Sequence, residues 1–175
     1  ADFKDEPEMA PQPTLKVVGS TIRGRCGEPF VARGVSEMLI WTLEDQDVRP
    51  WFSEMKKGGS NAVRLVWLPD GDLSTLRAAI EQALEFKMVP IIDLHGVERG
   101  LVPLTAAGRM RVILDFWTSK EVVSLIQDFE HALLIELGKP YLNEVPSAEW
   151  AEQLTTGLVA LRHAGIRVPV GVHVP

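Results

Sequence analysis

The chain is poor in cysteine, in positive charge and in long apolar runs, and each shortage excludes a class of protein. Its single cysteine, Cys26, cannot form an internal disulfide or supply a cysteine-rich zinc site. The 18 lysines and arginines are outnumbered by 24 aspartates and glutamates, which gives a net charge of −6. Without a basic run, the chain lacks the clustered positive charge that nucleic acids and anionic membrane surfaces require. No apolar stretch approaches the roughly 18 residues that a membrane span needs.

A tail and one folded domain account for the 175 residues. With 46% apolar residues, the chain is long enough to bury the core of one ordinary soluble domain. Residues 1–13 hold four acidic side chains and three prolines without apolar periodicity, which is typical of a disordered tail. We therefore expect a tail over residues 1–13 and a single domain over residues 14–175.

Short apolar runs recur along the folded part and predict buried strands. From Leu15 onward, β-rich runs broken by glycine and proline suggest a small hairpin that leads into a first strand near residues 30–35. Four later runs are nearly continuous in apolar residues, as the strands of a parallel sheet are. These runs are 61–67, 88–94, 132–137 and 168–173.

Helical periodicity fills the intervals between these runs and predicts four helices. Strands and helices that alternate about every 30 residues indicate βαβ units and a parallel sheet. The four helices are residues 48–57, a stripe from Leu73 to Leu84, a segment opened by a Thr118-x-x-Glu121 capping box, and a segment that runs from Ser147 to a stop at Gly165.

Two architectures are built from such units, and a missing motif separates them. An open doubly wound sheet usually binds a nucleotide on a glycine-rich first turn, but the first strand here runs into Ser36-Glu-Met38 without such a motif. A (β/α)₈ barrel instead gathers polar side chains at the C-terminal ends of its strands. We therefore predict an α/β fold, a truncated (β/α) TIM barrel of about five parallel strands with helices outside and an N-terminal β-hairpin. The polar strand ends are Glu37, Arg64 with Trp67, Asp93 with His95, Glu136 with Lys139, and His173.

An ordered set of motifs at these strand ends resembles glycoside hydrolase family 5, most closely the bacterial β-1,4-mannanases and related endoglucanases. The resemblance runs from about Leu15 to the end of the chain. It implies a (β/α)₈ scaffold, a groove for a β-linked polysaccharide, one catalytic glutamate after strand four and another after strand seven, and a secreted or periplasmic location. The motifs are Phe30-Val-Ala-Arg-Gly-Val35, Gly59-Ser-Asn-Ala-Val-Arg64, Ile92-Asp-Leu-His-Gly96, Phe116-Trp117 opening a helix, Leu134-Ile-Glu-Leu-Gly138, and Trp150-Ala with Leu161-Arg-His-Ala-Gly165.

This chain differs from the family at the expected positions of both catalytic glutamates. Members of the family end strand four with Asn-Glu, whereas this chain reads Gly138-Lys139-Pro140-Tyr141. Lys139 replaces either the Asn or the Glu, depending on whether one residue is deleted. A lysine is a poor substitute because it stays charged near neutral pH, whereas the acid must lose and regain its proton. We expect only the N-terminal half of the barrel here, so the strand-seven glutamate is not encoded.

Three residues on the strand ends are candidate binding or catalytic groups. Arg64 matches the family arginine that supports the nucleophile, and His95 matches the family histidine after strand three. His95 could instead be a structural histidine bonded to Asp93. Glu136 is the best substitute carboxylate for catalysis by position, but it could simply pair with Arg64 or Lys139. The displaced pair Asn143-Glu144 is interpreted as part of a solvated loop.

Aromatic residues complete the candidate substrate-binding set, because indole faces stack on sugar rings. Trp41 follows the first strand and Trp67 ends the second, so both are predicted platforms. Lys139 and Tyr141 join them as substrate-binding candidates. The other three tryptophans are predicted to be core residues. They are Trp51, Trp117 and Trp150.

Three functions remain open at this point. The chain could be a degenerate family-5-like protein that binds mannan or a glucan without cleaving it, and the loss of both glutamates favours this hypothesis. It could be an active endo-β-1,4-glycanase completed by a second chain or a missing half. It could also be a structural module without sugar affinity. No carboxylate and histidine set has the spacing of metal ligands, so we predict neither a metal nor another cofactor.

The predicted half-barrel also suggests self-association. Five parallel strands cannot close as eight do, so the first and fifth strands should present unpaired backbone groups. We expect an apolar inner face as well, and a homodimer that covers the open side. The residues expected on that face are Val63, Leu65, Ile91, Leu134 and Val170.

Overall fold

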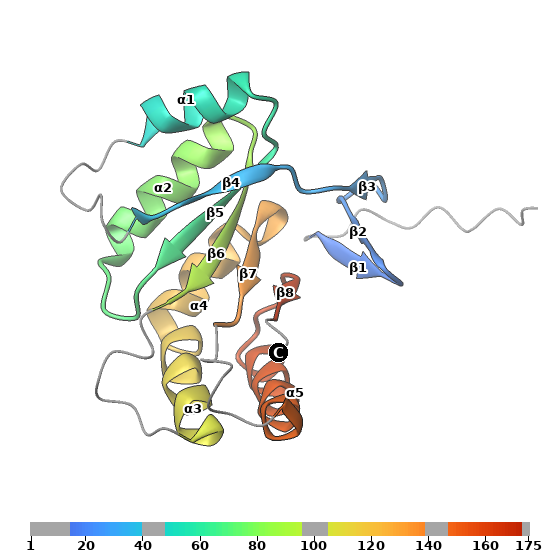
Figure 1. Cartoon of the computed structure of the whole chain (residues 1–175), viewed down its shortest axis with the longest axis vertical. Helices are drawn as coiled ribbons and strands as arrows, with labels where there is room; N and C mark the ends of the chain where they lie inside the picture. The colour runs from blue at the N-terminus through green and yellow to red at the C-terminus, as the bar shows by residue number, and fades with distance from the viewer. Residues whose placement is uncertain (1–14, 40–47, 96–104, 139–146, 173–175) are drawn as a thin grey trace, which may run out of the picture.

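The structure is a computed structural model, and it describes residues 15–39, 48–95, 105–138 and 147–172 (Figure 1). Two sheets are present in this part of the chain, a small antiparallel sheet near the N-terminus and a five-stranded parallel sheet. Within the same ranges, no helix combines the length and the apolar character that crossing a membrane requires.

The N-terminal sheet confirms the predicted hairpin and extends it by a strand. β1 (Lys16–Val18) pairs with β2 (Thr21–Arg23), which pairs in turn with β3 (Pro29–Phe30), all antiparallel. The tight turn between the first two strands passes through Gly19, whose φ of +58° lies in the region that glycine tolerates best. Figure 1 shows this small sheet set apart from the parallel sheet.

The parallel sheet contains the five predicted strands in sequential order. β4 and β8 form its two edges, so each has only one neighbouring strand. Sequential order with helical crossovers is the arrangement expected for the first strands of a (β/α) barrel. The strands are β4 (Gly34–Glu37), β5 (Ala62–Trp67), β6 (Val89–Leu94), β7 (Leu134–Glu136) and β8 (Val170–Gly171).

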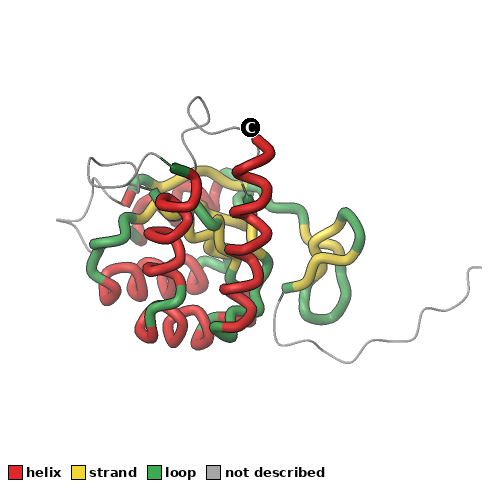
Figure 2. Tube along the Cα trace, turned by 90° about the horizontal axis from the view of Figure 1, so that it is seen from below, coloured by secondary structure: helices red, strands yellow, loops and turns green. Residues whose placement is uncertain are grey.

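Among the described residues, five α-helices rather than the four predicted connect these strands, and they lie on the same side of the sheet (Figures 1 and 2). A short 3₁₀ turn, Glu130–Ala132, precedes β7. The helices are α1 (Arg49–Lys57), α2 (Leu73–Glu85), α3 (Ala106–Trp117), α4 (Lys120–Asp128) and α5 (Ser147–His163).

The helix α3 was missed, and its neighbour begins one residue later than predicted. Residues Phe116 and Trp117 were expected to open a helix, but they close α3. The side chain of Thr105 caps the start of α3 by accepting a hydrogen bond from the backbone of Gly108. Ser119 rather than Thr118 caps α4, because the Thr118 hydroxyl is already donated to the Leu114 carbonyl at 2.7 Å.

The hydrophobic core lies between the helices and one face of the parallel sheet. Val63, Leu65 and Trp67 of β5 belong to this core together with Phe52 of α1 and Ile80 of α2. Because side chains alternate between the faces of a strand, Ala62, Arg64 and Val66 lie on the opposite face. We call that face, turned away from the helices, the inner face.

The prediction that five apolar side chains form an exposed inner face is wrong. Val63 and Leu65 point toward the helices and are buried, and Val170 packs against the same core. Ile91 and Leu134 share the inner face with Arg64 by register, but Leu134 is buried and Ile91 is half-buried. None of these five predicted residues is therefore an exposed apolar side chain.

Candidate functional site

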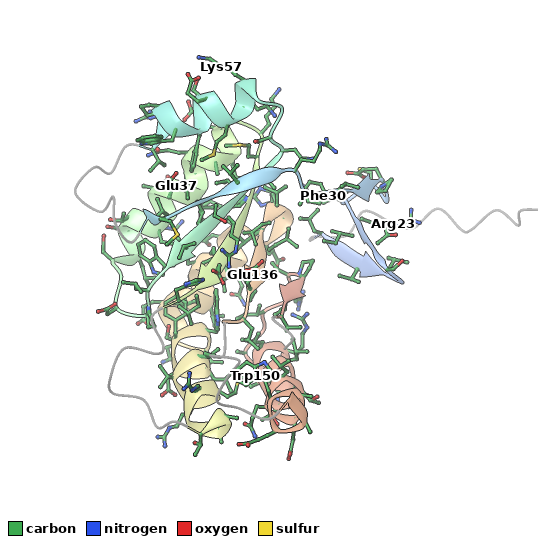
Figure 3. All side chains as sticks on the ribbon, viewed as in Figure 1. Arg23, Phe30, Glu37, Lys57, Glu136 and Trp150 are labelled. Atoms are coloured by element: carbon green, nitrogen blue, oxygen red, sulfur yellow. The ribbon has the colours of Figure 1, made fainter. Side chains whose placement is uncertain are left out.

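The inner face carries a charged cluster with Arg64 at its centre. The Arg64 Nη2 lies 2.5 Å from the Asp93 Oδ2, and the Arg64 Nε donates to the Glu136 Oε2 at 2.8 Å. On the other side, the Arg64 Nη1 reaches the Ser36 Oγ at 3.5 Å. One guanidinium therefore links four neighbouring strands, β4 to β7. Figure 3 shows Glu136 in the middle of the sheet, between the N-terminal sheet and the helices.

Strand register explains why these side chains meet. Ser36 lies beside Arg64 in the β4–β5 pair, and Asp93 lies beside Glu136 in the β6–β7 pair. Neighbouring parallel strands are about 4.8 Å apart, and paired residues present their side chains on the same face. The long Arg64 side chain then bridges one pair to the other. Because side chains alternate between the two faces of β5, Arg64, its single charged residue, lies on the same face as the carboxylates of the neighbouring strands.

Asp93 is the buried member of the cluster. Its side chain has no exposed surface, and burial raises the pKa of its carboxyl group. The neighbouring His95 and Arg64 oppose this shift because they favour the ionised form, whereas Glu136 adds to it. The His95 Nε2 lies directly against the Asp93 Oδ2, so the histidine is held by the buried carboxyl group.

Two contacts that the sequence suggested are present. His95 is bonded to Asp93, and Glu136 is paired with Arg64. Both side chains nevertheless keep some exposure, 27% for His95 and 24% for Glu136, and Arg64 keeps 26%. The cluster is therefore a half-buried polar surface at the C-terminal ends of the strands that a ligand could reach.

The carboxyl groups of Asp93 and Glu136 belong to residues that are paired in register on adjacent strands, and both groups contact Arg64. In glycoside hydrolases that use two carboxyl groups, these groups stand about 5 to 5.5 Å apart for retention and about 6.5 to 9.5 Å apart for inversion, across the scissile bond. Two carboxyl groups that contact nitrogen atoms of the same guanidinium leave no room for the sugar between them. This pair therefore does not have the geometry of a catalytic pair.

Glu37 stands apart from this cluster. It pairs in register with Leu65, so it lies on the helix side of the sheet rather than the inner face. Partial burial raises the pKa of its carboxyl group. Figure 3 shows it at the far end of β4 from the N-terminal sheet.

Trp67 is not the exposed platform that was predicted. It is 1% exposed, lies on the helix side of β5, and belongs to the main core. Gly71 packs so closely over its indole that a Cβ there would come within 2.5 Å of the ring. The prediction for Trp67 is therefore wrong, because the ring offers no free face to a sugar.

The prediction that three other tryptophans are core residues is confirmed for two of them and wrong for the third. Trp117 and Trp150 are core residues as predicted, whereas Trp51 is 58% exposed on α1 and is not. The predicted binding residues Trp41, Lys139 and Tyr141 lie outside the described residues, as do Asn143-Glu144, His173 and the expected tail.

The end of β7, just before Lys139, is held by a residue whose role the sequence did not reveal. The indole Nε1 of Trp117 donates to the Leu137 carbonyl at 2.8 Å. The next residue, Gly138, has a φ of +138°, and a Cβ there would lie 3.0 Å from the Ile113 side chain. Helix α3 therefore fixes where strand β7 ends. Within the described ranges, no group of three histidine, cysteine or acidic side chains could hold a metal ion.

The sequence of the chain is similar to part of a mannanase. No family model matches it. A mannan endo-1,4-beta-mannosidase of Salipaludibacillus agaradhaerens is 26% identical over 162 residues, which cover 86% of this chain and 48% of the relative. The chain therefore spans about half the length of the curated relative that it matches.

Solved structures show the same fold. A beta-mannanase from Streptomyces thermolilacinus, solved with mannohexaose, superposes with a TM-score of 0.79 at 22% identity over 94% of this chain and 54% of the mannanase. A thermostable GH5 cellulase from an Icelandic hot spring isolate gives a TM-score of 0.66 at 19% identity over 98% of this chain and 54% of the cellulase. The predicted resemblance to glycoside hydrolase family 5 is thereby confirmed over about half of such a domain. The fold is a truncated (β/α) barrel.

Proposed function

We propose that this chain binds a β-1,4-linked polysaccharide, a mannan or a glucan, on its inner face and does not hydrolyse it on its own. The observation that carries the proposal is the half-exposed cluster of Arg64, His95 and Glu136 at the C-terminal ends of the strands. In barrels of this class, ligands bind at that end of the strands. The fold shared with a mannanase solved with mannohexaose supports a glycan as the ligand.

The chemistry of the cluster suits the recognition of sugar hydroxyl groups. Arginine offers five N–H donors in a fixed plane, and a carboxylate accepts from hydroxyl groups. His95 is oriented by Asp93, which leaves its Nδ1 as the ring atom available to a ligand. These groups are held by ion pairs, so little side-chain entropy is lost when a sugar binds.

Two features support binding without cleavage. Where family members carry Asn followed by the acid/base glutamate, this chain reads Gly138-Lys139-Pro140, without a glutamate. The substitute candidate Glu136 is paired with Arg64, which also holds Asp93. An acid catalyst must deliver its proton to the glycosidic oxygen, and neither group stands across a bond from the other.

The experiment compares His95→Ala with the wild-type chain. Mannohexaose and cellohexaose binding is measured by calorimetry, and reducing-sugar release is measured on mannan and cellulose. We expect His95→Ala to weaken the affinity about tenfold, as the loss of one hydrogen-bonding group does. His131→Ala is the matched control, because His131 is an exposed histidine next to the start of β7, at the opposite end of the sheet.

Two outcomes would contradict the proposal. The first is that neither oligosaccharide binds to the wild-type chain, which would favour a structural module. The second is reducing-sugar release that Glu136→Gln abolishes, which would make Glu136 a catalyst.

A further inference from the structure

A cleft among the helices lies outside the inner face and takes no part in the proposed glycan site. It has a volume of about 440 Å³ and lies between the loop that joins β5 to α2 and the junction of α3 with α4 (Figure 1). Its apolar lining includes Leu73 of α2, Val112 and Phe116 of α3, and Val122 of α4. Ligand sites in proteins occupy about 300 to 1,000 Å³, so the cleft is large enough to hold several side chains of a ligand.

Three carboxylates surround this apolar lining. They are Asp70 in the loop after β5, Asp115 in the last turn of α3 and Glu121 in the first turn of α4. All three residues are exposed, and within the described ranges none of them forms an ion pair or a side-chain hydrogen bond. No lysine or arginine among the described residues lines the cleft. The cleft therefore combines an apolar floor with uncompensated negative charge.

Local structure explains the position of only one of these carboxylates. Glu121 lies at the start of α4, where the helix dipole favours a negative charge. Asp115 lies at the end of α3, where the dipole disfavours a carboxylate and no basic residue offsets it. Asp70 is not needed to cap α2, because Asp72 caps that helix. Asp70 and Asp115 therefore add negative charge to the cleft without stabilising the adjacent helices.

We propose that this cleft is a docking site for a short basic segment of a partner protein, in which lysine or arginine flanks apolar residues. The apolar side chains of the segment cover the partly buried Leu73 and Val112, and its cations lie beside Asp70 and Asp115. Burial of apolar surface favours the complex, and opposite charge orients the segment and speeds its association. The cleft lies outside the inner face, so this proposal does not depend on glycan binding.

Charge argues against this chain as the occupant of its own cleft. A second copy carries a net charge of −6. Among the segments outside the described residues, 1–14 holds four acidic side chains and one lysine, and 40–47 holds three acidic side chains and no basic one. Segments 96–104 and 139–146 each hold one charge of either sign. Charge complementarity therefore favours a separate, basic partner.

An NMR titration with synthetic peptides tests the proposal. The probe is acetyl-Lys-Leu-Leu-Lys-amide, and two matched peptides replace either both lysines by glutamate or both leucines by serine. We expect the probe to shift the methyl signals of Val112 and Val122 in a saturable manner and to leave the imidazole signals of His95 unchanged. Each matched peptide lacks one half of the complementarity, so both should bind at least about tenfold more weakly than the probe.

A double variant, Asp70→Asn with Asp115→Asn, tests the charge on the protein side. Both positions are exposed, so we expect the fold to persist and probe binding to weaken about tenfold at low ionic strength. The matched control, Glu81→Gln with Glu85→Gln, removes the same charge from exposed positions of α2 outside the cleft and should leave binding unchanged.

Three results would overturn the proposal. The first is a probe that shifts neither valine, or that shifts the His95 signals instead. The second is equal affinity of the probe for the wild-type chain and for the double aspartate variant. The third is a glutamate peptide that binds as tightly as the probe.

Discussion

Arg64 is the single residue on which the inner face depends most. Its guanidinium contacts both carboxyl groups, and it joins strands β4 to β7. Arg64→Met keeps much of the apolar stem but removes the guanidinium that contacts both carboxyl groups. Removing one partner of a buried pair is strongly destabilising.

We predict that Arg64→Met lowers the free energy of unfolding at pH 7 by about 2 to 4 kcal/mol, a range reduced for the partial exposure of Arg64. The loss should shrink toward pH 5, because burial raises the pKa of the Asp93 carboxyl group, which can then take up a proton instead of staying ionised without Arg64. Urea denaturation at both pH values measures the difference. A loss below about 0.5 kcal/mol at pH 7 would show that the ion pairs contribute little, as many exposed pairs do.

Trp67 and Trp51 exchange their predicted roles in the structure. The sequence contained the information for Trp67, because it lies three positions after Arg64 on the same strand and must face the other way. The prediction that Arg64 and Trp67 both face the site overlooked this alternation. Trp51 could not be assigned so easily, since it lies within a nine-residue helix with few apolar positions.

We predict that Trp67→Ala lowers the free energy of unfolding by about 3 to 5 kcal/mol, because it leaves a large cavity between β5 and the helices. Trp51→Ala is the matched control and should change it by no more than about 0.5 kcal/mol, as exposed substitutions do. Thermal and urea unfolding of the two variants measure the contrast. Equal effects would mean that the burial assigned to Trp67 is wrong.

At the scale of elements, strands were easier to predict than helices. Four strands of the parallel sheet, β5 to β8, lie in short apolar runs, and such runs leave few alternatives. The helix α3 was missed although Ala106, Met110, Ile113 and Trp117 follow helical spacing along its buried side. The buried Arg109 interrupts that apolar stripe, and a charged residue in the core is not expected from sequence.

Strand β7 is followed by Gly138, where the chain packs against Ile113 of helix α3. Gly138→Ala would place a side chain at a positive φ and against Ile113, whereas Gly19→Ala meets the same kind of backbone strain with no atom within 4 Å. We predict a loss of about 2 to 3 kcal/mol for Gly138→Ala and about 1 kcal/mol for Gly19→Ala. The difference between the two unfolding free energies isolates the contact with α3. Equal losses would show that Ile113 yields easily and that the strand end is not held by packing.

At the scale of the whole molecule, the open sheet leaves two edges. β4 and β8 each have one neighbour, and Val35 on β4 is 53% exposed. The five residues expected to form an apolar inner patch are buried or half-buried, so the edges alone now support self-association. Sequence alone could predict the number and order of the strands, but which side chains face inward depends on the register of each strand with its neighbours.

We predict a homodimer formed through the strand edges that depends on concentration, because exposed edges pair readily but offer little apolar area. Light scattering across micromolar concentrations measures the mass. A second dilution series with Val35→Lys should shift the equilibrium toward the monomer, since a charge on an edge strand opposes pairing. A constant monomer mass in the wild-type series would contradict this prediction.

The central claim is that the inner face binds a β-1,4-glycan without cleaving it. Titration calorimetry of the wild-type chain with mannohexaose tests both parts at once, because binding heat ends when each injection equilibrates and hydrolysis heat continues. We predict a saturable isotherm in which every injection returns to the baseline. Either no binding heat or a sustained heat after each injection, with shortened oligosaccharide recovered from the cell, would contradict the claim.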